Sequence, residues 1–178
     1  MQERGYARTT ARDLVAASGT NLASIGYHFG SKEALLDEAV TQAAQEWSDQ
    51  LGRIALTDPD ATPLQRIRAT WQALADSLDE HQPLIVAFFE ALAQADRSLQ
   101  VRNQLADCYE RLRAQTAEVV RETLSELPPD TARTVAAFFI AIADGLILQW
   151  WVDPTRAPTL DELWTALGLA LPAILGAE

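Results

Sequence analysis

The sequence predicts an all-α protein, and three observations support this fold class. No run of alternating Val, Ile or Thr is flanked by turn residues, so strand signals are nearly absent. Residues that start helices recur along the chain, often with an acidic or amide residue three positions later. Apolar residues then follow at helical spacing, and the apolar and charged fractions, 48% and 22%, are those of a globular protein.

The beginning of the chain predicts three helices in close succession. Thr10 and Asp13 resemble a capping box, and Gly19 lies where the first helix would end. Asn21 precedes a short second helix, and Ser31 precedes a long third one. The predicted ranges are 11–18, 22–29 and 32–56.

The rest of the chain predicts five further helices separated by turns. The stretch His81-Gln82-Pro83 is expected to separate two of them, because proline has no backbone N–H to donate. Residues expected to cap helix starts are Thr62, Asp130 and Thr159. The predicted ranges are 63–78, 83–96, 98–127, 131–151 and 160–175.

Charge is distributed unevenly between the two ends of the chain. The net charge is −11, yet residues 1–32 carry four basic and two acidic side chains, so the remainder carries −13. A short basic end on an acidic body is the pattern of a DNA-binding head with a body that does not bind DNA. We therefore predict two domains, a helix-turn-helix head at 1–40 and a helical body at 41–178.

The second predicted helix has an apolar face and a small polar face. Its apolar side chains recur at helical spacing and would pack inward, namely Leu22, Ile25 and Phe29. Ser24, Tyr27 and His28 share the opposite face. In a helix-turn-helix this face enters the major groove, where Ser24 and Ala23 can meet base edges while Tyr27 and His28 donate to phosphates. The alternative interpretation is ordinary half-buried helix surface.

Lys32 is expected in the first turn of the long third helix, where the helix dipole disfavours a cation. A DNA phosphate at this point would be bound by both the free backbone amides and the lysine. The alternative is a solvated lysine with no ligand.

Several classes of protein are disfavoured by the same sequence. The two histidines, His28 and His81, lie far apart, and we find no catalytic set, no phosphate-binding glycine motif and no metal-ligand cluster. We expect no enzyme activity, no metal and no cofactor. The apolar run at 135–152 contains Asp144 and Gln149, which indicates a core or subunit-interface helix rather than a membrane span. The single cysteine, Cys108, favours the cytoplasm.

The segment from Gly5 to Val40 carries a specific resemblance. Its Gly-Tyr and Thr-Thr pairs, its Asp-Leu pair, Gly19 and above all the string YHFGSKEALL at 27–36 resemble the DNA-binding segment of the tetracycline-repressor (TetR) family of transcription regulators. The stretch ADGLILQWWVDP at 143–154 is similar to the penultimate helix of that family. Members begin with a further helix, of which only residues 1–4 remain here, so we expect a less well braced head.

The resemblance implies roles for individual residues of the head. Those expected to contact DNA phosphates are Thr9 or Thr10, Tyr27, His28 and Lys32. Those expected at base edges are Ala23, Ser24 and Asn21. The partner would be double-stranded operator DNA with two half-sites, bound by a homodimer.

For the body, the resemblance implies an effector-binding domain that dimerises through its last two helices. Aromatic and aliphatic side chains could enclose an apolar cavity for an uncharged or cationic lipophilic effector, although plain core is the alternative. The residues expected there are Trp71, Leu74, Phe88, Phe89, Leu92, Tyr109, Leu112, Phe138 and Ile142. Asp144 would be a polar anchor in this cavity or a helix-interface hydrogen-bonding group. The residues expected at the dimer interface are Phe139, Gly145, Gln149, Trp164, Gly168 and Leu171.

The function indicated by these features is an effector-responsive transcriptional regulator, most simply a repressor released from a pseudo-palindromic operator by a small molecule. The alternative is an all-α dimeric protein that binds small molecules or partners but not DNA.

Overall fold

The computed structural model describes Tyr27 and residues 32–176 of the 178-residue chain, and all regular structure among them is helical. This confirms the predicted all-α class. The helices are α3 (Lys32–Ala55), α4 (Pro63–Asp76), α5 (Leu78–Gln94), α6 (Leu99–Thr123), α7 (Pro129–Val152) and α8 (Leu160–Leu175).

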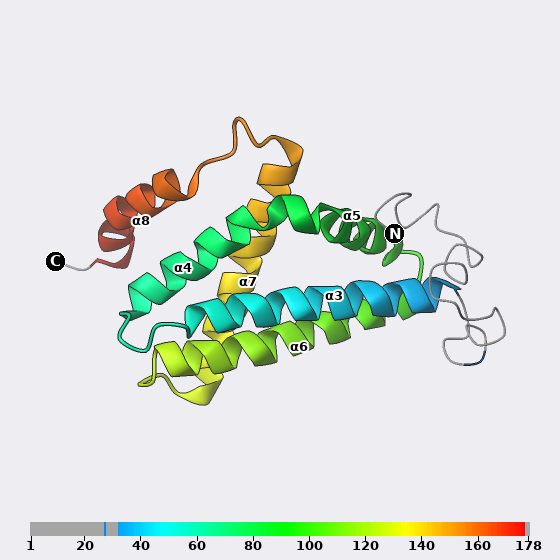
Figure 1. Ribbon diagram of the computed structural model, residues 1–178, viewed down its shortest axis with the longest axis horizontal. Helices are drawn as coiled ribbons and strands as arrows, with labels where there is room; N and C mark the ends of the chain where they lie inside the picture. Colours follow the sequence, from blue (N-terminus) through cyan, green and yellow to red (C-terminus); the bar gives the residue numbers. More distant parts are fainter. Residues whose placement is uncertain (1–26, 28–31, 177–178) are drawn as a thin grey trace.

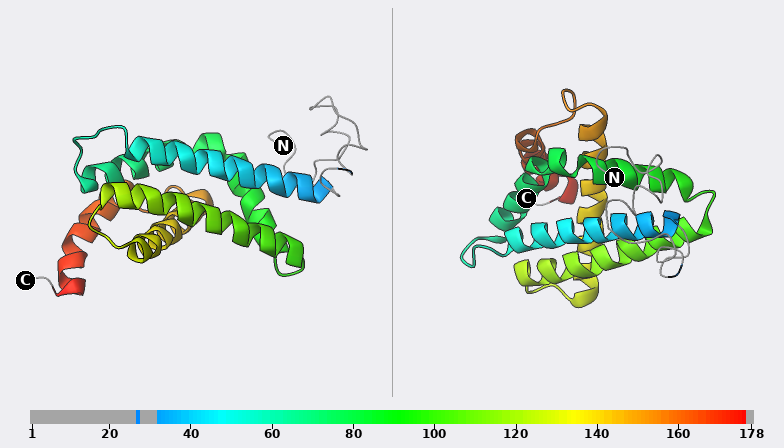
Figure 2. Two further views of the ribbon diagram at one scale, coloured as in Figure 1. Left: turned by 90° about the horizontal axis from the view of Figure 1, so that it is seen from below. Right: turned by 45° about the vertical axis from the view of Figure 1, so that its right-hand side comes forward.

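The long helices α3 and α6 form the central pair of the body. They lie side by side, and α7 crosses behind them (Figures 1 and 2). Between the two helices Gln115 Nε2 donates to Asp49 Oδ1 at 2.6 Å. About one turn further on, a Cβ atom added at Gly52 would lie 3.2 Å from Val119 Cγ2, so the glycine permits a close approach of the two helices.

Small residues allow α7 to pack closely on α6. Ala132 and Ala136 of α7 are fully buried, with 0% exposure, against Ala117 and Val120 of α6. The four form one apolar cluster that also includes partly buried side chains at the α6–α7 turn. An alanine surface lets helix axes approach closely, so α6 and α7 make the most extensive contact of the body.

A second cluster joins α4 to α7 and to the start of α8. Trp71, Leu74 and Leu146 are its buried members. Partly buried residues from α3 and α7, and Leu160, Leu163 and Trp164 from the first turns of α8, surround them. Residues 165–169 of α8 are exposed, and Figure 1 shows α8 beside α4 at the edge of the body. The first turns of α8 therefore pack on the core of the body, whereas the following turns do not.

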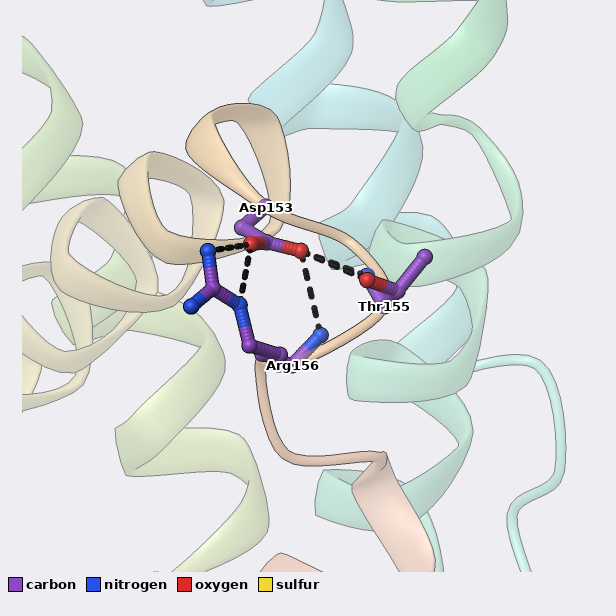
Figure 3. Close-up of polar contacts among 3 residues, drawn as sticks. All are labelled: Asp153, Thr155 and Arg156. Carbon is purple, nitrogen blue, oxygen red and sulfur yellow. Dashed lines mark hydrogen bonds and ion pairs between the residues drawn. The ribbon is translucent and has the colours of Figure 1, made fainter.

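The turn between α7 and α8 is fixed by one carboxylate. Asp153 follows α7 and accepts hydrogen bonds from the backbone N–H and hydroxyl of Thr155 and from the backbone and guanidinium of Arg156 (Figure 3). These bonds hold the pKa of Asp153 below its ordinary value, and the bond from the Thr155 hydroxyl has the largest effect. Trp150 Nε1 also donates to the Pro158 carbonyl oxygen at 2.8 Å, so both ends of the turn are anchored.

Two predicted capping boxes are confirmed. At α4 the Thr62 hydroxyl accepts from the Gln65 N–H, and the Gln65 side chain accepts from the Thr62 N–H. Thr159 and Glu162 form the same reciprocal pair at α8. Ser98 also caps α6, since its hydroxyl accepts from the Val101 N–H.

We predict that Thr62→Ala lowers the free energy of unfolding by about 1 kcal/mol, because the start of α4 loses its side-chain cap. Urea unfolding followed by circular dichroism measures this value. The Gln65→Ala variant and the double variant complete a cycle. Since both side chains belong to one box, the double variant should cost less than the sum of the single ones. Strict additivity would contradict a reciprocal box.

The structure corrects three expected helix boundaries. His81-Gln82-Pro83 does not interrupt the chain, because α5 begins at Leu78 and contains Pro83. The break lies at Ser77, so the proline falls early in the helix, where the missing N–H removes a single bond. Asp130 lies in the first turn of α7 rather than capping it, since the helix begins at Pro129. The helix α6 ends at Thr123, earlier than expected.

Within the described part of the chain, α7 is the one helix whose length and apolar composition would allow it to cross a membrane, with a mean hydropathy of 1.8. Only a small share of the 18-residue apolar stretch of α7 is buried inside the described part of the chain. The same helix packs on α6 through its alanines and carries the polar residues Asp144 and Gln149. These contacts favour a helix with one face on its own core and a second face that remains open.

Candidate functional site

A cavity of about 580 Å³ lies among α3, α4, α5, α6 and α7. This volume falls within the range of about 300–1,000 Å³ that is usual for small-molecule sites. Its wall is mainly apolar, with aromatic rings contributed by all five helices. Those aromatic residues are Trp47, Trp71, Phe88, Phe89, Tyr109 and Phe139.

A carboxyl–phenol pair on the wall links α6 to α7. The Tyr109 hydroxyl donates to Asp144 Oδ2 at 2.7 Å. Burial raises the pKa of Asp144, and the hydrogen bond from Tyr109 opposes this in part. Burial, followed by the hydrogen bond to Asp144, raises the pKa of Tyr109 well above its ordinary value. Tyr109 therefore remains a neutral donor.

Two other polar contacts lie on the α3 and α4 sides of the cavity. Asp49 and Gln115 form the pair already described, and Gln115 Oε1 is buried without a hydrogen-bond partner. Arg66 also reaches the wall, but its guanidinium donates to the carbonyl oxygens of Pro59 and Ala61 in the α3–α4 turn. This arginine thus holds the turn.

Seven of the nine residues predicted for the effector pocket line this cavity: Trp71, Leu74, Phe88, Phe89, Leu92, Tyr109 and Leu112. The other two do not. Phe138 is 61% exposed and is absent from the cavity wall. Ile142 packs against the core cluster of Trp71, Leu74 and Leu146. Ligand contact by the seven stays a prediction, since a cavity lining alone does not identify a ligand.

The sequence reasoning missed the contribution of α3. Trp47, Ser48 and Leu51 line the cavity, although none of them was expected there. Trp47 and Leu51 are four residues apart and therefore share a helix face, which was the available signal. Trp47 also donates from Nε1 to Ser77 Oγ at 2.9 Å and stacks on His81 with ring centroids 4.4 Å apart. These contacts join α3 to the α4–α5 junction.

A second feature is an apolar face of α7 that the described part of the chain leaves open. Its exposed side chains follow helical spacing: Phe138, Ala141, Leu148 and Val152. Gly145 lies in the same row, and a Cβ atom added there would meet no atom within 4 Å. Leu167 and Leu169 of α8 are also exposed. We call this row, together with the exposed part of α8, the α7–α8 face.

The residues predicted for the dimer interface divide between this face and the interior. Gln149 and Gly168 are exposed, and Gln149 donates to the Gly145 carbonyl oxygen. Phe139 instead lines the cavity, one position and about 100° around the helix from Phe138. Trp164 is half-buried in the core cluster, with the Arg68 guanidinium 5.3 Å from its ring centroid. The side chain of Leu171 lies outside the described residues.

Of the eight residues predicted to contact DNA, the structure describes two, Tyr27 and Lys32. Tyr27 is helical and 86% exposed. Lys32 is the first residue of α3, as the sequence predicts, while its side chain lies outside the described residues. Also outside are Thr9, Thr10, Asn21, Ala23, Ser24 and His28.

The fold and the cavity define a class: a helical body with a ligand-sized apolar chamber, joined to the N-terminal segment by one long helix. Family models name the class. The model "Bacterial regulatory proteins, tetR family" matches residues 1–39, and "BetI-type transcriptional repressor, C-terminal" matches residues 63–176. The second match covers more than half of the chain. The chain belongs to the TetR family of bacterial transcription regulators, which confirms the predicted family and its non-enzymatic class.

Curated relatives match along most of the chain. The HTH-type transcriptional regulator TtgR of Pseudomonas putida is 28% identical over 178 residues, covering 94% of this chain and 83% of the relative. The HTH-type transcriptional repressor DhaR of a Mycobacterium species is 30% identical over 181 aligned positions, which cover 95% of this chain and 85% of the relative. KstR2 of Mycobacterium tuberculosis, another HTH-type transcriptional repressor, is 25% identical and covers 94% and 84%.

Solved structures share the fold. A TetR transcription regulator from Haloarcula marismortui superposes with a TM-score of 0.61 at 20% identity, covering 85% of this chain and 79% of the other. The reduced form of NemR from E. coli gives a TM-score of 0.61 at 17% identity, covering 94% and 88%.

Proposed function

We propose that this TetR-family regulator is a homodimeric repressor that a lipophilic small molecule, uncharged or cationic, releases from a pseudo-palindromic operator in the cytoplasm. The observation that carries the proposal is the course of α3. Its first residues, 32–39, belong to the segment matched by the DNA-binding family model, and its later residues, including Trp47 and Leu51, line the cavity. One continuous helix therefore belongs to both proposed sites.

The proposed release is a shift between two conformations. A ligand that prefers the conformation in which the two heads are wrongly spaced must lower operator affinity. Operator DNA lowers ligand affinity by the same factor, because the coupling between two sites is reciprocal.

The α7–α8 face supports the dimer. Phe138 and Leu148 lie in one exposed apolar row of α7, and Leu169 of α8 is exposed as well, and exposed apolar surface is the kind that marks a protein–protein contact. We propose that these two helices from each of two copies form a four-helix bundle, as the family resemblance implies.

A direct test measures binding to the DNA upstream of the protein's own gene by fluorescence anisotropy, at low salt, with and without N-phenyl-1-naphthylamine, a neutral lipophilic probe. The proposal expects specific binding that the probe weakens. Binding of the probe with no specific DNA binding would instead support the alternative function, a helical small-molecule-binding protein without an operator.

For the head, we predict that Tyr27→Phe with Lys32→Ala weakens binding to every operator variant by a similar factor. The slope of log K against log salt concentration should also fall by about 0.9, since one cation–phosphate contact is lost. The exposed position of Tyr27 and the start of α3 at Lys32 agree with phosphate contacts.

The matched comparison is Ser24→Ala, which should change the preferred sequence while leaving the salt slope unchanged, because base contacts specify sequence and phosphate contacts position the protein. If all three substitutions change affinity equally for every sequence, the proposed division between phosphate and base contacts is wrong.

A further inference from the structure

We propose that the effector is a lipophilic cation and that the carboxylate of Asp144 is its counter-ion. This inference rests on the proposed function, because it names the chemical class of the molecule that the cavity takes. It also identifies Asp144 as the residue that determines the charge of the ligand.

The first argument is that the carboxylate of Asp144 has no cation among the described residues. Asp144 lines the cavity, and its hydrogen-bond partner is the neutral hydroxyl of Tyr109. None of the ion pairs found in this part of the chain includes it. Asp144 is half-buried, and partial removal of a carboxylate from water without a positive partner is costly, so burial raises its pKa. A positive charge brought by a ligand removes this cost, whereas a neutral or negative ligand does not.

The charged and titratable groups around Asp144 support this assignment. Tyr109 and Cys108 of α6 are neutral groups with raised pKa values. Across the cavity, α3 presents the carboxylate of Asp49, which adds negative charge. Of the two arginines on the wall, Arg66 is bound to backbone carbonyl oxygens and Arg53 is exposed. The interior of the cavity therefore favours a positive ligand.

A free acceptor and the aromatic rings of the wall are compatible with the same class. Three wall donors are already used: Trp47 Nε1 by Ser77, the Tyr109 hydroxyl by Asp144, and Gln115 Nε2 by Asp49. An acceptor remains, since Gln115 Oε1 is buried without a partner. The aromatic rings of the wall, with Phe88 edge-on to Tyr109 at 5.9 Å between centroids, can bind a cation through their faces. A cation with aromatic or aliphatic substituents matches both features.

The test uses two probes of the same shape and opposite charge, tetraphenylphosphonium and tetraphenylborate, measured by quenching of tryptophan fluorescence, since Trp47 and Trp71 line the cavity. At pH 8 we expect tetraphenylphosphonium to bind more tightly than tetraphenylborate. The Asp144→Asn variant should lose about 30-fold or more of the tetraphenylphosphonium affinity, as expected when one partner of a buried charge pair is removed. Its tetraphenylborate affinity should not fall.

Controls separate charge from damage to the fold. Asp107→Asn removes an equal charge from an exposed position of α6 outside the cavity, and should leave tetraphenylphosphonium binding unchanged. Tyr109→Phe leaves the carboxylate in place and should preserve the preference for the cation. The neutral probe N-phenyl-1-naphthylamine should bind the native chain and Asp144→Asn within about threefold, which shows that the cavity of the variant is intact.

The pH dependence gives an independent readout. Because the pKa of Asp144 is raised, the affinity for tetraphenylphosphonium should be constant above that pKa and fall as the pH drops through it, since protonation removes the counter-charge. Asp144→Asn should show no such fall. Equal tetraphenylphosphonium affinity in the native chain and in Asp144→Asn overturns the inference while leaving the proposed function standing. If neither tetraphenylphosphonium nor N-phenyl-1-naphthylamine binds, the proposed ligand cavity itself fails.

Discussion

Replacing Phe138 with arginine should convert the proposed dimer into monomers at micromolar concentration. Phe138 is the most exposed aromatic residue of α7 and lies in a row with Leu148 and Val152 that the described part of the chain does not cover. In the proposed bundle an arginine there would be buried against apolar side chains without a partner. Loss of a large aromatic contact at the centre of an interface typically costs about 2–4 kcal/mol, so the dimer dissociation constant should rise by about 30- to 1,000-fold.

Sedimentation velocity across a range of protein concentrations measures this change. Leu99→Arg is the matched control, because Leu99 is an exposed apolar residue (71%) at the start of α6, at the end of the body opposite α8 in Figure 1. It should leave the dimer intact. A Phe138→Arg protein that sediments as a stable dimer would show that the copies associate through a different surface. Operator affinity should fall together with dimer formation if, as proposed, two heads bind two half-sites.

Replacing Trp71 with alanine should lower the free energy of unfolding by about 3–5 kcal/mol, the usual cost of removing a buried aromatic side chain. Trp71 is 9% exposed and belongs to the cluster that joins α4 to α7 and α8. Because Trp71 also lines the cavity, its removal enlarges a space that already exists, which adds to the cost of the lost contacts. The loss is a large fraction of the roughly 5–15 kcal/mol available to a domain.

Urea unfolding of all variants at one fixed protein concentration measures the effect, because the stability of a dimer depends on concentration. Leu64→Ala, an apolar truncation at an exposed position of the same helix, should change the free energy of unfolding by no more than about 0.5 kcal/mol. A similar loss for both variants would mean that the cluster around Trp71 does not stabilise the fold.

Most helix boundaries could be predicted from short-range chemistry. Thr62 and Gln65, like Thr159 and Glu162, form their boxes within a single turn, so the signal and the structure have the same length scale. Pro83 shows where this reasoning ends. A proline is compatible with the early turns of a helix, and the start at Leu78 accompanies a contact between Ser77 and Trp47 of α3. That contact joins residues 30 positions apart and has no local signature.

The sequence could predict which kinds of residue line the cavity, but not which side of α7 points toward it. The aromatic residues of α4, α5 and α6 that the sequence predicts for an effector pocket line the cavity, and each of these helices has a distinct apolar face. The helix α7 is apolar on nearly all sides, so periodicity could not distinguish Phe138 from Phe139. In the structure the buried Ala132 and Ala136 orient α7 against α6. In this orientation Phe139 points toward the cavity and Phe138 points away from it.

The two faces of α7 have a thermodynamic consequence. A ligand in the cavity would contact the side of the helix that carries Phe139 and Asp144, and a second subunit would contact the side that carries Phe138 and Leu148. Ligand occupancy and self-association then act on one helix, and any factor by which the ligand changes the association constant also multiplies the affinity of the ligand for the dimer. Effector sensitivity would thus depend on how many copies of the protein a cell contains.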